Sequence, residues 1–217
     1  ALPVVVVEEC IADELVGLLK KYVADMNLGP AYDKETGMGP ILNAGHLKFI
    51  TDWIEKGIKE GAELVVDGRN PTVPGYENGF YLAPTIFDHV TPEMSIAWEE
   101  IFGPVLCIKR VKNFEEGITL MNSSRFANGS VIYTQNGHFA REFSKRTDAG
   151  MVGINVGIPV PLGIFGFTGH KDSFFGDLHV MGKDGISFYT ETKCVTATWF
   201  PEDREECGTV DTWDGTI

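Results

Sequence analysis

Apolar residues along the first half of the chain recur with a helical period, between short apolar runs that are typical of buried strands. The pattern predicts helices over 11–27 and 43–60, and Gly61 is expected to end the second helix. Strands are predicted over 3–7, 62–66, 80–87 and 103–111. The apolar stripes are Leu15, Leu18, Leu19, Tyr22 and Met26 in the first helix and Leu47, Ile50, Ile54 and Ile58 in the second.

The second half alternates strands and helices. Asn113 and Glu116 form a capping pattern that predicts a helix over 114–123. A strand over 130–134, a helix over 137–148 with Gly150 as its cap, and a strand over 151–156 follow. This β-α-β-α-β order predicts an α/β fold with a largely parallel sheet flanked by helices.

The pattern changes after Val156. Residues 157–185 are rich in Gly, Pro and Phe and show no period, and a stretch of this length without structure is usually functional. Residues 187–199 alternate as a strand does, which predicts an edge strand that needs a partner. The acidic residues of 201–217 predict a poorly ordered tail.

Charge narrows the possible partners. The formal net charge of −13 argues against nucleic acid and anionic membranes as ligands. No apolar run is long enough for a membrane span, and the apolar N-terminus lacks the basic region of a signal peptide. The chain begins directly in a predicted core strand, so we expect it to be truncated.

Four cysteines occur, at positions 10, 107, 194 and 207. They form no CxxC pair and no Cys/His cluster with zinc spacing, so no metal site is predicted. Cys107 and Cys194 fall inside predicted strands, where a buried thiol behaves as a small apolar side chain.

The segment SIAWEEIFGPVLCIKRV (95–111) places two carboxylates before a Phe-Gly-Pro turn. Side chains alternate in direction along an extended chain, so Glu100 and Phe102 can point together while Glu99 and Ile101 point elsewhere. An acid and a ring on one side can contact a ligand, or they can form an ordinary strand entrance. The residues by themselves leave both readings open.

EEIFGPV stands in an ordered set of motifs: GMGPILN, GAELVVDGR, GFYLAPTIFDHVTPEMSIAWEEIFGPV, DAGMVGINV and FYTETKCVTATW. With this set, the chain resembles the C-terminal half of the aldehyde dehydrogenase superfamily over roughly residues 1–200. The resemblance implies a catalytic domain over 1–185, an oligomerisation strand over 186–200 and a tail over 201–217. Residues 155–190 are similar to the methylmalonate-semialdehyde dehydrogenases, the branch that acylates coenzyme A.

The resemblance implies a chemistry. A cysteine thiolate attacks the aldehyde, hydride passes to NAD, and coenzyme A takes the resulting thioester. The expected substrate is methylmalonate or malonate semialdehyde, and a carboxylate is lost to give propionyl- or acetyl-coenzyme A. The expected assembly is a homo-oligomer formed through strand 187–199. The expected location is the cytoplasm, or the mitochondrial matrix in a eukaryote.

The resemblance also assigns residues. Glu100 would accept hydrogen bonds from the nicotinamide ribose, and Phe102 would lie against the nicotinamide ring. Asn155 and Phe165 are expected near the substrate. For Asn155 a loop cap is an equal alternative, and for Phe165 core packing is. His170 and Lys171 could meet an anion, although solvated loop residues are the simpler reading.

No catalytic residue is assigned within the chain. In the resembling branch the nucleophilic cysteine stands just before a Met-Ala-Leu-Pro sequence, and this chain opens with Ala1-Leu2-Pro3. We therefore expect the chain alone to be inactive. Two other readings remain: a fragment of a hydrolytic aldehyde dehydrogenase, or a non-catalytic assembly module that uses strand 187–199.

Overall fold

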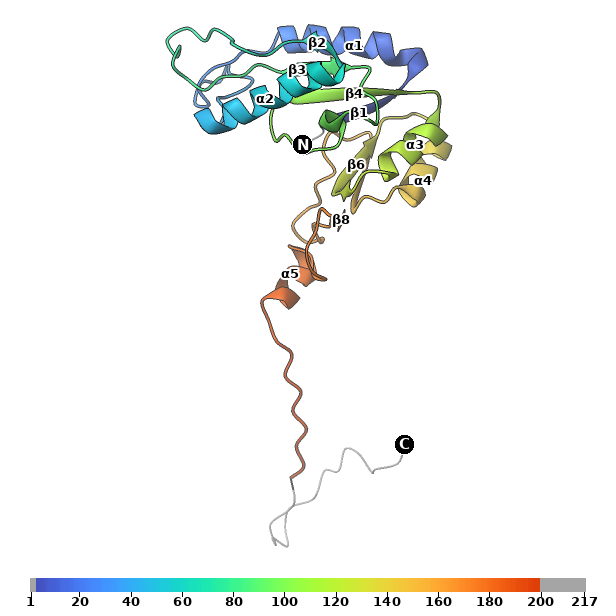
Figure 1. Cartoon of the computed structure of the whole chain (residues 1–217). Helices are drawn as coiled ribbons and strands as arrows, with labels where there is room; N and C mark the ends of the chain where they lie inside the picture. The colour runs from blue at the N-terminus through green and yellow to red at the C-terminus, as the bar shows by residue number, and fades with distance from the viewer. Residues whose placement is uncertain (1–2, 200–217) are drawn as a thin grey trace, which may run out of the picture.

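A computed structural model describes residues 3–199 of the chain (Figure 1). Its largest sheet has four strands in the order β1 (Val4–Glu8), β4 (Val105–Val111), β3 (Thr85–Asp88) and β2 (Glu63–Val66). β1, β4 and β3 are parallel, and β2 pairs antiparallel with β3 at one edge. The prediction of an α/β fold with a largely parallel sheet is confirmed.

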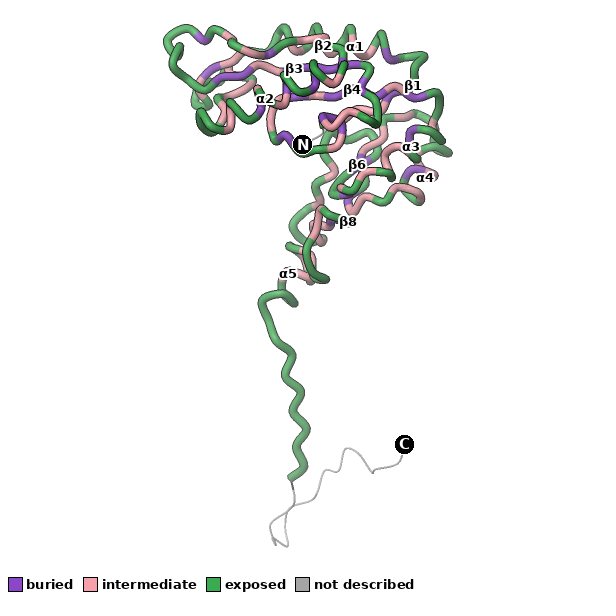
Figure 2. The backbone as a smooth tube through the Cα atoms, viewed as in Figure 1, coloured by how far each residue is buried: buried purple, intermediate pink, exposed green. Residues whose placement is uncertain are grey.

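Two helices cover opposite faces of this sheet. Phe87 and Cys107 pack against α2 (Ala44–Glu60), whereas Ile86 and Ile108 pack against α1 (Glu9–Ala24). Neighbouring residues of β3 and β4 thus point to opposite faces, as strand geometry requires. Figure 2 shows the resulting core, with most buried residues in and around the four-stranded sheet.

A second, smaller group of elements continues the chain. β6 (Gly129–Ile132) and β7 (Met151–Ile154) form a parallel pair, with α3 (Phe114–Asn122) and α4 (Gly137–Arg146) beside them. β5 (Phe126–Ala127) pairs with β8 (His170–Lys171). The short helices η1 (Ser95–Ala97) and α5 (Gly182–Phe188) complete the described elements.

The helix caps largely follow the sequence. Asn113 accepts a hydrogen bond from the amide of Glu116, and Gly61 ends α2 with a positive φ of 95°. The prediction that Gly150 caps α4 is wrong, because α4 ends at Arg146 and Thr147 is its cap. A Cβ on Gly150 would lie 2.7 Å from the carbonyl of Thr168, so this glycine permits a close backbone approach instead.

The stripe predicted for the first helix is partly wrong. Leu15 and Leu19 pack against the core, but Leu18, Tyr22 and Met26 are exposed. Ala12, Val16 and Val23 take their place on the buried face. In the second helix Ile50 and Ile54 are fully buried, whereas Ile58 is 37% exposed.

One predicted strand and one stretch predicted to be irregular differ from the structure. The strand expected over 80–87 begins only at Thr85, because the amide of Ala83 bonds to the carbonyl of Gly68 in the preceding turn-rich segment. Residues 157–185 are also less irregular than expected, since β8 and the start of α5 lie there.

The strand predicted over 187–199 does not form within the described chain, and the assembly role expected for 186–200 stays a prediction. Residues up to Phe188 belong to α5, and 190–199 are exposed and pair with no strand among residues 3–199. Figure 1 shows them leaving the body as an extended segment. Cys194 is accordingly exposed rather than buried. The predicted disorder of 201–217 concerns residues outside the described range.

Among the helices described, none is both long and apolar enough to cross a membrane.

Candidate functional site

The segment Glu99–Val105 links η1 to β4 and carries three exposed residues, Glu99, Glu100 and Phe102. Ile101 is 5% exposed and belongs to the core beside α2. A Cβ on Gly103 would lie 2.6 Å from Cδ1 of Ile50, so glycine lets this backbone pack on the helix. The carbonyl of Pro104 then accepts the amide of Thr85 at 2.8 Å and starts the parallel sheet.

Glu100 and Phe102 face solvent from this segment. Phe102 is 81% exposed and has a φ of 54°, in the left-handed region that bulky residues rarely adopt. Nε2 of His46 lies 2.9 Å from its carbonyl oxygen. Glu100 is exposed, and no hydrogen bond or ion pair engages its carboxylate within residues 3–199. The segment therefore offers a carboxylate acceptor next to an exposed ring.

Glu99 has a different role from its neighbour. Its Oε2 accepts a hydrogen bond of 2.8 Å from Nη2 of Arg125. Nη1 of Arg125 lies 3.5 Å from Asp172, so one guanidinium joins the Glu99 segment to the loop that begins directly after β8. No signal in the sequence pairs these residues, because they lie far apart along the chain.

Asn155 stands directly after β7 with a positive φ of 55°. Its side-chain oxygen accepts the amide of Thr134, and its side-chain nitrogen donates to the carbonyl of Thr134, both at 2.9 Å. The amide group is thus bonded to the backbone that follows β6, as in the loop-cap alternative. A contact with substrate stays a prediction.

Phe165 lies in the loop between β7 and β8 and is 60% exposed. Its amide donates to the carbonyl of Leu162 at 2.9 Å, which forms a local turn. Glu100 and Phe102 lie together on one segment, whereas no hydrogen bond joins them to Asn155 or Phe165 among the described residues. Glu100 and Phe102 are therefore two exposed residues of one short segment, and Asn155 and Phe165 are separate candidates.

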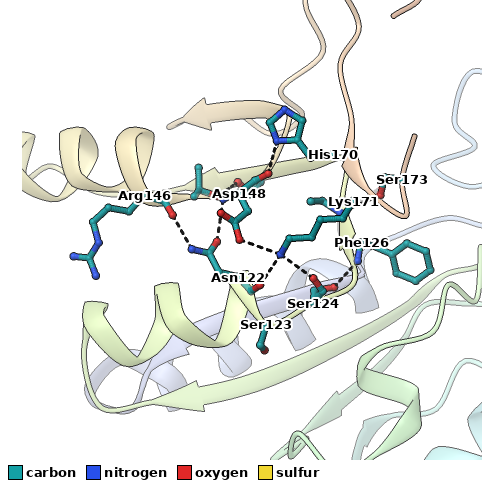
Figure 3. A network of polar contacts seen from close by, with 12 residues as sticks. Asn122, Ser123, Ser124, Phe126, Arg146, Asp148, His170, Lys171 and Ser173 are labelled. Atoms are coloured by element: carbon teal, nitrogen blue, oxygen red, sulfur yellow. Dashed lines mark hydrogen bonds and ion pairs between the residues drawn. The ribbon is translucent and has the colours of Figure 1, made fainter. Parts of the chain in front are cut away.

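His170 and Lys171 hold the loop after β7 against α3 and α4 (Figure 3). Nζ of Lys171 donates to the carbonyls of Asn122 and Ser124 and forms an ion pair of 3.0 Å with Asp148. Nδ1 of His170 lies 2.6 Å from the carbonyl of Asp148. Both residues are exposed, as the solvated alternative expects, but each side chain is also engaged by these contacts.

Asn122 lies at the centre of the same contacts (Figure 3). It donates to the carbonyl of Arg146 and accepts the amide of Asp148. Ser173 accepts the amide of Ala127, which attaches the start of the following turn to β5. The network fixes the end of the long loop that carries Phe165.

Burial changes the ionisation of two side chains on β4. It raises the pKa of the Cys107 thiol to about 12 and lowers the pKa of Lys109 to about 8. Lys109 lies 3.5 Å from the ring centre of Trp98, just before Glu99. A buried thiol with a raised pKa is a poor nucleophile, and Cys10 and Cys194 are exposed.

No cluster of three or more His, Cys, Asp or Glu side chains arranged to hold a metal ion occurs within residues 3–199. A hollow of about 300 Å³ lies between α2 and the segment after β2. Arg69 lines it, but its guanidinium is engaged by Asp67 and Glu55. The exposed pair on the Glu99–Val105 segment remains the strongest candidate for ligand contact.

Comparison with known proteins gives consistent matches. A profile described as "Aldehyde dehydrogenase family" matches residues 1–195. The chain is 50% identical over 200 residues to malonate-semialdehyde dehydrogenase 2 of Shouchella clausii, which covers 92% of this chain and 41% of that protein. The chain thus spans about two fifths of the length of this curated relative.

Two solved structures are similar throughout the matched region. A putative methylmalonate-semialdehyde dehydrogenase of Sinorhizobium meliloti, complexed with NAD, aligns with a TM-score of 0.89 and 44% identity over 93% of this chain and 41% of that one. Methylmalonate-semialdehyde dehydrogenase of Oceanimonas doudoroffii also gives a TM-score of 0.89, with 41% identity over 93% of this chain and 42% of that one.

Proposed function

The chain belongs to the aldehyde dehydrogenase family, and from this we propose that it is part of an NAD-dependent semialdehyde dehydrogenase that acylates coenzyme A. The substrate is malonate or methylmalonate semialdehyde. With malonate semialdehyde, one NAD⁺ and one coenzyme A give acetyl-coenzyme A, CO₂ and NADH, which balances atoms and charge. Support comes from the identity to a malonate-semialdehyde dehydrogenase.

One observation carries the cofactor assignment: the carboxylate of Glu100 and the ring of Phe102 are both exposed, two positions apart on one short segment. A carboxylate is an acceptor only, and its two oxygens suit a pair of vicinal hydroxyls such as those of a ribose. Phe102 offers a flat apolar face for the nicotinamide ring. These residues fit NAD, which when bound supplies the hydride acceptor.

The chemistry of the two side chains determines the role of each residue in cofactor binding. Glu100 orients the ribose, and Phe102 positions the ring. Of the cations near these residues, Arg125 is paired with Glu99 and Lys171 with Asp148. We propose that the groups that bind the substrate carboxylate and coenzyme A, and the nucleophilic cysteine, belong to the part of the relatives' length that this chain does not span. We infer that the 217 residues by themselves do not oxidise aldehydes.

The test uses the full-length protein that carries this chain. NADH formation from malonate semialdehyde is followed by absorbance, with and without coenzyme A, and the product is identified by mass spectrometry. We expect turnover that depends on coenzyme A and yields acetyl-coenzyme A. A free acid formed at the same rate without coenzyme A would support the hydrolytic alternative instead.

Assembly is a second part of the proposal. Residues 190–199 are exposed and pair with no strand within the described range, and their alternating pattern suits an edge strand. We propose that they pair with a second copy of the chain to form a homo-oligomer. Thr196→Pro removes a backbone donor from this segment, so sedimentation of the full-length variant should give monomers. An unchanged oligomer would contradict the role of this segment.

A further inference from the structure

We propose that His46 and Arg125 are positioning residues that hold the segment Glu99–Phe102 at its two ends. Their effect is to present Glu100 and Phe102 to the same ligand. The inference rests on the cofactor contact proposed above. It adds two residues that are not part of that contact.

Arg125 holds the first end. Its Nη2 donates to Oε2 of Glu99 at 2.8 Å, and its guanidinium lies 4.2 Å from the ring centre of Phe126. Stacking on a ring limits the freedom of a long side chain, so the charge is presented in one direction. Glu99 is thereby held next to β5, and its neighbour Glu100 is left without a partner within residues 3–199.

The same arginine is itself fixed by the loop that begins at Asp172, directly after β8. The amide of Asp172 donates to the carbonyl of Arg125 at 3.1 Å, and the carboxylate of Asp172 lies 3.5 Å from Nη1. β5 and β8 pair through Phe126 and Lys171, directly beside these contacts. The position of Glu99 therefore depends on the attachment of this loop, which Lys171 also secures.

His46 holds the second end. It lies in the first turn of α2, where its amide is bonded to the cap residue Asn43. Its ring stacks on Phe49 with a centroid distance of 5.8 Å. Because a carbonyl oxygen only accepts, Nε2 donates to the carbonyl of Phe102 at 2.9 Å.

This second contact acts on an unfavourable backbone conformation. Phe102 has a φ of 54°, and a bulky residue leaves the left-handed region when nothing holds it there. The buried side chain of Ile101 anchors the middle of the segment but does not fix the carbonyl that follows. The hydrogen bond from His46 supplies that constraint and so sets the direction of the Phe102 ring.

The test measures NAD binding to the full-length protein by fluorescence titration, and thermal unfolding of each variant. His46→Leu removes the donor, and we expect the dissociation constant for NAD to rise about fivefold. His46→Gln keeps an N–H at the same position and should stay within about twofold of the original. Arg125→Met should raise the constant about threefold, because its ion pair is partly exposed.

Arg146→Met is the matched control. Arg146 is also a partly exposed arginine that pairs with a carboxylate, Glu115, and lies over a ring, Phe114. It has no contact with Glu99–Phe102, so we expect an unchanged constant. The single variants Arg125→Glu and Glu99→Arg place like charges together and should each weaken NAD binding. The double variant restores opposite charges, so it should weaken NAD binding less than either single variant.

The kinetic readout separates positioning from folding. At saturating NAD, the turnover number of His46→Leu and Arg125→Met should stay near that of the unsubstituted protein, while KM for NAD rises. The melting temperature of both variants should stay the same. If Glu100→Gln weakens NAD binding but neither variant does, the positioning role is wrong and the proposed contact stands. If Glu100→Gln itself has no effect, the contact and the inference fail together.

Discussion

Gly57 sits at the point where α2 packs on η1, and its replacement by alanine gives a sharp test of that packing. Alanine normally stabilises a helix interior relative to glycine by about 0.5–1 kcal/mol. At Gly57, however, a Cβ would overlap Cδ1 of Ile96 and lie 3.2 Å from Cζ of Phe87. Both side chains are fully buried, so neither can move into solvent.

The magnitude follows from two opposing effects. Overpacking a core costs about 1–3 kcal/mol, and this opposes the gain in helix propensity. Gly17 in α1 supplies the comparison, because nothing lies within 4 Å of a Cβ built there. Gly17→Ala should therefore stabilise the chain by about 0.5–1 kcal/mol, and Gly57→Ala should be less stable than Gly17→Ala by about 1–3 kcal/mol.

Urea unfolding of the two variants measures this difference. Ile96→Val removes the obstructing Cδ1, so the double variant Gly57→Ala/Ile96→Val should be more stable than the sum of the single changes predicts, by about 1 kcal/mol. Equal stabilisation by Gly57→Ala and Gly17→Ala, or strict additivity of the double variant, would refute the close packing of α2 on η1.

Substitutions at three other positions test charges and hydrogen bonds. The pKa of Lys109 is about 8 in the folded chain, below its ordinary 10.5, so above pH 8 the unfolded chain binds more protons and stability rises with pH. The thiol of Cys107 has a folded pKa raised from 9, so above pH 9 its titration lowers stability and opposes this rise. Lys109→Met should remove about 1 kcal/mol of that rise between pH 8 and 9, as measured by urea unfolding; a pH profile that matches the original would contradict the burial of the charge. Burial raises the pKa of Asp88, but the hydrogen bonds that its carboxylate accepts, first those from Arg110, outweigh burial and hold the pKa below its usual value. The stability that these hydrogen bonds contribute is therefore lost as pH falls through the lowered pKa. Arg110→Met should lower the free energy of unfolding by about 3 kcal/mol at pH 7 in the same assay, and this loss should become smaller below about pH 4. A loss that does not change with pH would exclude the ion pair of Arg110 and Asp88 as its source. Asn155→Ala should lower unfolding free energy by about 1–2 kcal/mol and Asn155→Gly by less, because glycine adopts a positive φ freely; equal losses would show that φ plays no part.

Local patterns predicted local features well. The cap formed by Asn113 and Glu116 and the end of α2 at Gly61 are visible because their partners lie within a few residues. The parallel α/β class followed from the alternation of strands and helices. Ile50 and Ile54 are buried as the helical period indicated.

Contacts between distant residues could not be predicted in this way. His46 meets the carbonyl of Phe102 across 56 positions, and Arg125 meets Glu99 across 26. Neither side chain differs in type from an ordinary surface residue, so periodicity and capping rules give no signal for them. The exposure of Phe102 and of Glu100 likewise results from the fold.

Two differences between the predicted and the described elements have physical causes. The first helix carries more apolar residues than one face can bury, and the structure places Val16 and Val23 inward while Tyr22 remains exposed. The alternation of polar and apolar residues over 187–199 indicates a strand with two faces of different polarity. It does not indicate which other strand pairs with it. The chain offers no partner for 190–199 within residues 3–199.

The most direct test of the account is a crystal structure of the full-length protein with NAD bound. We expect both carboxylate oxygens of Glu100 within about 2.5–3.0 Å of the nicotinamide ribose hydroxyls, with the Phe102 ring against the nicotinamide and its carbonyl still bonded to His46. A structure in which Glu100 remains in solvent while NAD is bound elsewhere would contradict the proposed cofactor contact.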